Sequence, residues 1–213
     1  MQVCLGVQVS TAEAVTVCTC GSVGRTDGIR QCPEHFHFWY GDKRMSSVGS
    51  VIQAVLPTDW SKIDPQVLAN AQERGKRVDV HFSEYVKTGN VSIPAGERQD
   101  VIERLDALVE WWDRSGLRAV EVQGIAFSEE DGIAGMFDIR VEGGFIDLKV
   151  VSALQPSYSL QLGSYVTYGD EDYAAILHSS SKGVRLVEYD ADQCREWWKS
   201  GVAWWKAMQG ISK

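Results

Sequence analysis

Apolar residues recur every three or four positions in several stretches of the chain, which predicts amphipathic helices. Proline and glycine mark several of their ends. Asp64 and Pro65 provide an N-cap and a first helical residue, while Gly89 and Gly116 are typical helix stops. The expected helices span residues 46–57, 64–89, 96–116, 156–169 and 190–208.

Short apolar runs bounded by turn residues predict β-strands between and after these helices. Three strands follow one another, with turns at Glu129–Asp131 and at Gly143-Gly144, and two later strands form a hairpin. The expected strands span residues 118–128, 132–142, 144–152, 173–180 and 183–190. This order predicts an α/β fold with a mixed central β-sheet and helices on both faces.

The same pattern divides the chain into two regions. Residues 1–45 lack a clear period and gather Cys, Gly and His between positions 18 and 37, so we expect an irregular N-terminal segment. Residues 46–213 hold all the expected helices and strands. A chain of 213 residues is long enough for one sizeable domain with a genuine core.

Composition narrows the class of protein. No apolar run reaches the roughly 18 residues of a membrane span, and the first ten residues lack the features of a signal peptide. We therefore expect a cytoplasmic protein without a membrane partner. The net charge of −8 gives no general attraction to nucleic acid, although a local basic channel is compatible with it.

Two charged residues interrupt an otherwise apolar strand. Asp147 and Lys149 lie two positions apart, so they point to one face of the sheet. If Gly143-Gly144 is the two-residue turn of a hairpin, positions that sum to 287 face each other, and Asp138 lies opposite Lys149. Glu121 projects from the preceding strand between two valines. Burying such charges without partners costs several kcal/mol or more, so the cluster requires partners or a purpose.

Metal binding is such a purpose. Carboxylates in an apolar site form a hard oxygen-ligand pocket for Mg²⁺ or Mn²⁺, which activates water and polarises a phosphoryl oxygen. Lys149 is placed to hold the attacking water or to stabilise negative charge. Gln161 and Tyr165, four apart on the next helix, share a face that can close the site.

These residues carry a resemblance to a known family. From about residue 75 to 190 the chain resembles the PD-(D/E)XK nuclease superfamily, in particular its RecB-like and lambda-exonuclease-like branch, which implies a restriction-endonuclease-like core. The segment "GIAGMFDIRVEGGFIDLKVV" resembles the branch's Gly-Asp strand followed by Ile-Asp-x-Lys, and "QLGSY" resembles its Gln-x-x-x-Tyr motif. The segments "ERGKRVDVHFSEYVKTG" and "HFWYGDKRMSSVGSVI" resemble two earlier motifs, with Gly49 where the family has Thr. Met and Phe precede Asp138, where many relatives have Pro or Thr before the Asp.

The resemblance implies a role for each matched position. It makes Glu121, Asp138 and Asp147 ligands of a catalytic Mg²⁺ or Mn²⁺ ion, together with the backbone carbonyl of Leu148. It makes Lys149 the catalytic lysine. It assigns Gln161 and Tyr165 to orienting the site and the DNA phosphate. His81, in the helix after Gly75, becomes a further metal ligand or a substrate contact.

A second motif lies in the N-terminal segment, where two close pairs of soft ligands suit structural Zn²⁺. The pairs are Cys18 with Cys20 and Cys32 with His35, and His37 is an alternate fourth ligand. Some members of the family carry an iron–sulfur cluster held by four cysteines, which we consider less favoured. The spare cysteines here are Cys4 and Cys194. Free thiols are the remaining interpretation.

The main hypothesis is a metal-dependent deoxyribonuclease, an exonuclease of recombination, repair or replication that acts on single- or double-stranded DNA. The small size suggests a phage-encoded enzyme working in the host cytoplasm, and the acidic surface suggests that a recombination or replication partner protein assists loading. An inactive DNA-binding or scaffold module on a nuclease fold is the alternative. A nuclease acting on RNA is the third hypothesis, and a requirement for the 2′-OH would identify it. The oligomeric state stays open.

Overall fold

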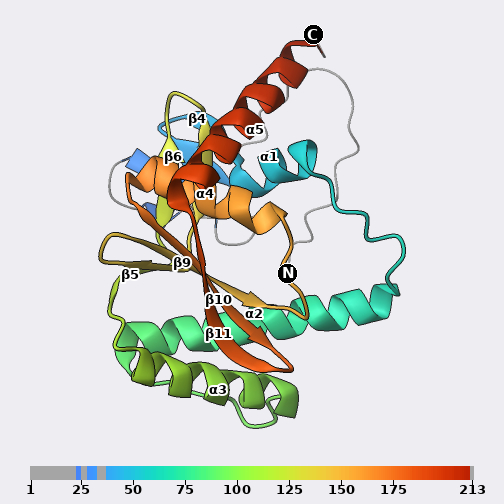
Figure 1. The fold of residues 1–213 in the computed structure, drawn as a ribbon, viewed down its shortest axis with the longest axis vertical. Coiled ribbons are helices and arrows are strands. Elements are labelled where there is room, and N and C mark those ends of the chain that lie inside the picture. The colour runs from blue at the N-terminus through green and yellow to red at the C-terminus, as the bar shows by residue number, and fades with distance from the viewer. Residues whose placement is uncertain (1–22, 25–27, 33–36, 212–213) are drawn as a thin grey trace.

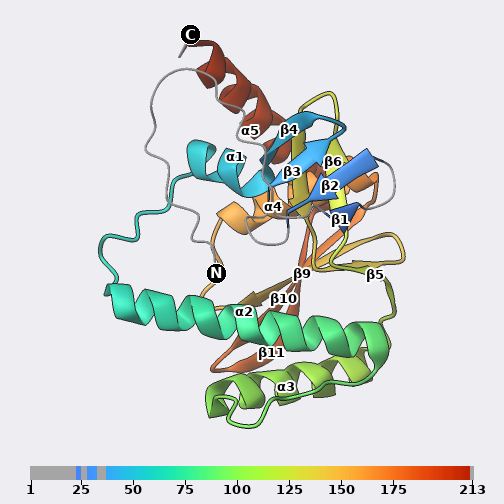
Figure 2. The ribbon, with the colours of Figure 1, turned by 180° about the vertical axis from the view of Figure 1, so that it is seen from behind.

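The computed structural model describes residues 23–24, 28–32 and 37–211. Among them, five helices surround two β-sheets (Figures 1 and 2). The helices are α1 (Val48–Val55), α2 (Pro65–Thr88), α3 (Gln99–Ser115), α4 (Ser157–Gly169) and α5 (Ala191–Ile211). The expectation of a mixed α/β fold with helices on both sides is confirmed.

Helix boundaries follow the expected signals closely. The Asp64 carboxylate accepts hydrogen bonds from the backbone N–H groups of Gln66 and Val67, and Pro65 is the first helical residue. Gly89 and Gly116 end α2 and α3 in the left-handed conformation that glycine adopts without strain. These local chemical signals therefore locate the two long helices.

The smaller sheet carries the charged strand predicted from the sequence. It has the order β11-β10-β9-β8-β5, with β9 and β10 parallel and the other neighbours antiparallel. Its strands are β5 (Ala119–Val122), β8 (Ile139–Val141), β9 (Gly144–Val150), β10 (Tyr173–Ser180) and β11 (Gly183–Tyr189). The hairpin of β10 and β11 is confirmed.

The other sheet has the order β1-β2-β3-β4-β7-β6. Its strands are β1 (Val23–Gly24), β2 (Ile29–Gln31), β3 (Phe38–Tyr40), β4 (Lys43–Ser47), β6 (Ile125–Ser128) and β7 (Ile133–Met136). The expectation that residues 1–45 are irregular was wrong for the described part. Ser46 and Ser47 pair with β7, which ties this part of the chain to the second sheet and delays the start of α1 to Val48.

Two expected strands are each broken into two, which was not predicted. The 118–128 run breaks at Gln123-Gly124, and the 132–142 run breaks at Phe137-Asp138. The breaks lie side by side, because the Gln123 N–H donates to the Asp138 carbonyl at 2.7 Å and the Phe137 N–H to the Gly124 carbonyl at 3.0 Å. Gln123 takes a positive φ of 56°, and Gly124 leaves no room for a Cβ against the Phe137 ring. The chain therefore passes from one sheet to the other at this point.

The expected register of the β8–β9 hairpin was wrong by one residue on each strand. Val141 pairs with Gly144 and Ile139 with Ile146, so paired positions sum to 285 and the turn is Glu142-Gly143. The cause is Gly144, whose Cα lies against the Tyr173 carbonyl of β10, where any Cβ would overlap it. A glycine required by packing in a strand has the same appearance in the sequence as a turn glycine.

Helices cover both faces of the β8–β9–β10 region (Figures 1 and 2). Helices α2 and α3 pack on one face, in a core that includes Phe82, Leu105 and Leu148. Helix α4 covers the opposite face and contacts Phe145. Helices α5 and α1 pack beyond α4 around Trp198. Strand β9 is thus enclosed from both sides, which explains why a charge on it is buried.

Candidate active site

Asp147 and Lys149 lie on the face of β9 that carries Phe145, toward α4. Asp147 is buried, with 1% of its surface exposed, and it forms an ion pair with the Lys149 ammonium. Neither of its carboxylate oxygens accepts a regular hydrogen bond from the described part of the chain. A buried carboxylate in this condition is costly to maintain, because its desolvation is only partly offset by one neighbouring charge.

Asp138 reaches the same place from the break before β8. Its Oδ2 accepts a hydrogen bond of 2.7 Å from the backbone N–H of Leu148. Because the N–H and C=O of one strand residue point to the same side, the Leu148 carbonyl also faces the edge where Asp138 lies. Asp138 does not pair opposite Lys149 as the expected register required. It bridges the gap that opens between the two strands before Ile139 of β8 and after Ile146 of β9.

Asp79 of α2 completes the group and was missed in the sequence. It is partly buried. Its charge raises the pKa of Asp138, and the charge of Asp147 raises the pKa of Asp79. Its position between the buried residues Val78 and Phe82 indicates the packed face of α2. That signal was available, but the sequence does not show that this face crosses the open end of the β8–β9 pair.

The shared environment shifts the protonation of these groups. Burial, together with the charges of Asp147 and Asp79, raises the pKa of Asp138 well above its ordinary value, against the opposing effects of Lys149 and the Leu148 N–H. Burial and the charge of Asp147 also raise the pKa of Asp79. Burial opposes the charged form of Lys149, yet Asp147 and Asp138 raise the pKa of its ammonium. The site thus concentrates negative charge beyond what one lysine neutralises.

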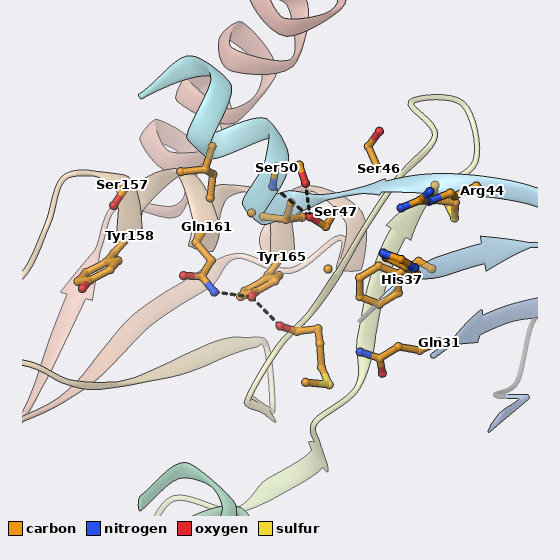
Figure 3. A pocket seen from close by; sticks show the side chains of 17 residues that line it. Gln31, His37, Arg44, Ser46, Ser47, Ser50, Ser157, Tyr158, Gln161 and Tyr165 are labelled. Carbon is orange, nitrogen blue, oxygen red and sulfur yellow. Dashed lines mark hydrogen bonds between the residues drawn. The ribbon is translucent and has the colours of Figure 1, made fainter. Parts of the chain in front are cut away.

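Gln161 and Tyr165 lie on the face of α4 that covers the site, as expected. The Gln161 amide donates to the Tyr165 hydroxyl at 2.7 Å, and that hydroxyl donates to the Met136 carbonyl at 2.7 Å (Figure 3). Burial and the charges of Asp147 and Asp138 raise the pKa of Tyr165 well above its ordinary value. The Tyr158 ring lies 5.1 Å from the Lys149 nitrogen. Helix α4 therefore contributes one wall of the site.

Glu121 and His81 occupy different surroundings from the three aspartates. Glu121 is an exposed residue of β5, with its carboxylate beside Gly124. His81 is buried, and its Nε2 lies 3.1 Å from an oxygen of Glu97, which also accepts two hydrogen bonds from Arg77. Neither group is among the charges that shift the pKa of Asp138, Asp79 or Lys149.

The N-terminal Cys/His motif falls largely outside the described residues, which exclude Cys18, Cys20 and His35. Cys32 is buried next to β2, and its backbone N–H donates to the His37 carbonyl at 2.8 Å. The described portion of this motif thus consists of Cys32 and the alternate ligand His37.

Two cavities flank the carboxylates and share Tyr158 as a lining residue. One, of about 790 Å³, lies between α4 and the start of α1 (Figure 3). Arg44 and His37 enter it from the strand side, and Ser47 and Ser50 lie at the α1 N-terminus. The other, of about 630 Å³, is lined by Asp79, Asp138 and Lys149 on one side and by exposed apolar residues that include Trp60 on the other. Asp79 and Asp138 thus line a cavity that opens to solvent, whereas Asp147 lies behind them and lines neither cavity.

The donor set suits a hard divalent cation, but it is not a closed metal site. Within the described ranges, no three His, Cys, Asp or Glu side chains are grouped as a ready ligand cluster. The Lys149 ammonium takes the place beside Asp147 that a cation requires. Asp147 nevertheless offers two buried oxygens that accept no regular hydrogen bond from the described residues, and Asp138 and the Leu148 carbonyl lie beside it. These oxygens fit Mg²⁺ or Mn²⁺ once Lys149 moves aside.

Comparison with known proteins gives a similarity of fold at low identity. No family model matches the chain, and no curated protein does. A solved structure of an alkaline exonuclease (LHK-Exo) from Laribacter hongkongensis aligns over 79% of this chain and 89% of its own, with a TM-score of 0.48 and 13% identity. The same exonuclease in complex with dAMP aligns over the same shares with a TM-score of 0.46 and 14% identity. In the described chain, no helix is long and apolar enough to cross a membrane.

Proposed function

We propose that the protein is a metal-dependent nuclease that hydrolyses DNA phosphodiester bonds. The observation that carries the proposal is Asp147, a buried carboxylate that accepts no regular hydrogen bond from the described residues and lies beside Asp138, Asp79 and Lys149. A purely structural site has no need for this costly cluster, since an apolar residue of similar size is generally at least as stable there. The motif order of these residues supports membership of the PD-(D/E)XK superfamily and its RecB-like and lambda-exonuclease-like branch.

The ligands that we propose for Mg²⁺ or Mn²⁺ are Asp138, Asp147 and the Leu148 carbonyl, with Asp79 from α2. The cation would lower the pKa of a bound water and offset negative charge on the phosphoryl group. Glu121 stays in the proposal as an outer ligand on β5. We assign His81 to orienting Glu97 and Arg77 rather than to the metal, because its Nε2 is engaged there.

Lys149 pairs with Asp147 in the structure, and its ammonium would be free to turn toward the cavity that it lines if a cation took its place beside Asp147. There it holds the attacking water or stabilises charge on a non-bridging phosphate oxygen. The Tyr158 ring, 5.1 Å away, limits where the ammonium can move. Gln161 and Tyr165 fix the wall opposite by their hydrogen bonds to each other and to Met136.

We propose that the cavity of Figure 3 is the binding site of a substrate phosphate. The first turn of α1 presents backbone N–H groups at its surface, and Ser47, Ser50 and Arg44 add donors of the kind that bind phosphate. A phosphate-binding site next to the cleavage site favours the end of a DNA strand, because a strand end can enter a cavity that a continuous duplex cannot enter. We therefore propose exonuclease action in recombination, repair or replication.

The proposals for the rest of the chain follow the sequence. We propose structural Zn²⁺ for Cys18, Cys20, Cys32 and His35. A cytoplasmic location and a phage origin, with a partner protein that assists loading, extend the same proposal. None of these is needed for the chemistry at Asp147.

A cleavage assay tests the function. End-labelled linear and covalently closed circular DNA, single- and double-stranded, are incubated with Mg²⁺, Mn²⁺ or EDTA, beside the Lys149→Ala variant and a matched RNA. Metal-dependent loss of linear DNA, absent in the variant, supports an exonuclease. Cleavage of circles replaces that assignment with an endonuclease, and action confined to RNA replaces the substrate class. No cleavage by a folded protein that binds Mn²⁺ favours the inactive DNA-binding module.

A further inference from the structure

A third cavity, of about 380 Å³, lies between α2, α3 and the turn that joins β10 to β11. It opens at the same end of the sheet as the carboxylates, because Ser179 pairs with Val150, the residue after Lys149. Arg74 lines both this cavity and the one that contains Asp138. The two cavities are therefore neighbours along one edge of the molecule.

Two residues that line this cavity each have a buried hydrogen-bond donor with no acceptor among the described residues. The Ser179 side chain lines the cavity although 1% of the residue is exposed, and its Oγ has no hydrogen-bond partner among the described residues. The buried Nε of Arg74 likewise has none within the described ranges. Buried donors are nearly always satisfied in folded proteins, so two in one cavity indicate a missing acceptor.

The charges in the cavity also favour an acceptor with negative charge. Arg74 and Arg104 both line the cavity; burial and the positive charge of Arg74 lower the pKa of Arg104, against the opposing effects of Asp100 and Glu103. Arg104 takes part in no ion pair with the described residues.

Carboxylates also line the cavity, but their charge is partly compensated. Asp100 receives hydrogen bonds of 2.9 and 2.7 Å from Arg98 and a longer contact of 3.5 Å from Arg74. Glu103 is exposed, and its carboxylate accepts a 3.3 Å hydrogen bond from Gln99. The positive charge of Arg104 thus stays available to a ligand.

We infer that this cavity binds a phosphate of the DNA backbone through Arg104, Arg74 and Ser179. The inference rests on the proposed function and adds a second contact point for the strand that passes the carboxylates. Guanidinium and hydroxyl donors together match the oxygens of a phosphodiester. A contact to the phosphate backbone positions the strand without selecting its sequence.

Binding of DNA without metal tests this site separately from cleavage. We would measure the fluorescence anisotropy of labelled single-stranded oligonucleotides in EDTA over a range of salt concentrations. Arg104→Ala should weaken binding roughly five- to tenfold and reduce the salt slope by about 0.7, the value for one lost phosphate contact on a single strand. Ser179→Ala should weaken binding by a smaller factor. Arg114→Ala on the same helix is the matched control, because Arg114 is exposed and outside the cavity.

Each outcome bears on the site alone. An Arg104→Ala slope equal to that of Arg114→Ala overturns the inference, whether or not the enzyme cuts DNA. Calorimetric binding of inorganic phosphate by the wild type but not by Arg104→Ala, with no effect of the variant on oligonucleotide binding, identifies a free-phosphate site instead. Circular dichroism on Arg104→Ala and Ser179→Ala verifies folding, and the Ser179 variant preserves the test if Arg104→Ala unfolds.

Discussion

The backbone N–H of Leu148 donates a 2.7 Å hydrogen bond to the carboxylate of Asp138, and this contact joins β9 to the break before β8. The two strands stop pairing beyond Ile139 and Ile146, so the contact replaces a regular ladder bond. It fixes Asp138 next to Asp147 and leaves the Leu148 carbonyl directed to the same side. The opening between two strands is therefore what allows acidic side chains and a backbone oxygen to converge.

The first prediction distinguishes the roles of Asp79 and His81 in α2. Asp79→Asn should lower cleavage and Mn²⁺ affinity by at least about tenfold, because it removes one of the converging carboxylates. His81→Gln should instead lower the free energy of unfolding, because it disturbs the buried Glu97 that both His81 and Arg77 contact. Parallel titrations with Mn²⁺ and thermal melts of the two variants measure this. A large loss of Mn²⁺ affinity in His81→Gln with none in Asp79→Asn would reverse the assignment.

The second prediction concerns stability without metal. At neutral pH in EDTA, Asp138→Asn should raise the melting temperature by a few degrees, because it removes one of several adjacent buried negative charges. The sign follows from the raised pKa of Asp138: folding favours its protonated form, so the wild type gains stability as pH falls and the carboxyl becomes neutral. The advantage of the variant should shrink toward pH 4 and below. Melts across this pH range check it, and an advantage that grows on acidification would contradict it.

The third prediction uses two adjacent glycines. Gly144→Ala should destabilise the protein by about 3 kcal/mol, because its Cβ meets the Tyr173 carbonyl and separates β9 from β10. Gly143→Ala is the matched control, since nothing lies within 4 Å of its Cβ and its φ of +80° alone imposes about 1 kcal/mol. Urea unfolding of both variants provides the comparison. Equal losses would contradict the requirement for glycine at position 144.

The fourth prediction concerns the wall of the site on α4. Tyr165→Phe removes the hydroxyl that bridges Gln161 and the Met136 carbonyl, so it should cost about 1 kcal/mol of stability and lower the cleavage rate. Thr167→Val, on the same helix, is a suitable control, because its hydroxyl bonds only within α4, to the Gly163 carbonyl. Similar stability losses in both with a rate loss only in Tyr165→Phe would support the role of Tyr165. Unchanged cleavage in Tyr165→Phe would limit it to packing.

The sequence predicted what depends on local chemistry. Asp64, Gly89 and Gly116 mark helix ends by their own conformational preferences, and the two-residue spacing of Asp147 and Lys149 determines a shared face on any strand. It could not predict what depends on distant packing. The requirement for a glycine at 144 comes from Tyr173, nearly thirty residues later, and shifted the register. Asp79 joins the carboxylates because α2 crosses an opening that two strand breaks create.

Measuring Mn²⁺ binding directly tests whether Asp147 is a metal ligand. Calorimetric or paramagnetic titration would compare the wild type with Asp147→Asn and with Asp106→Asn, an exposed aspartate of α3 outside the cavities. We predict that Asp147→Asn loses at least tenfold in Mn²⁺ affinity together with cleavage, while Asp106→Asn retains both. Wild-type Mn²⁺ affinity in a folded Asp147→Asn protein would contradict the assignment of this carboxylate as a metal ligand.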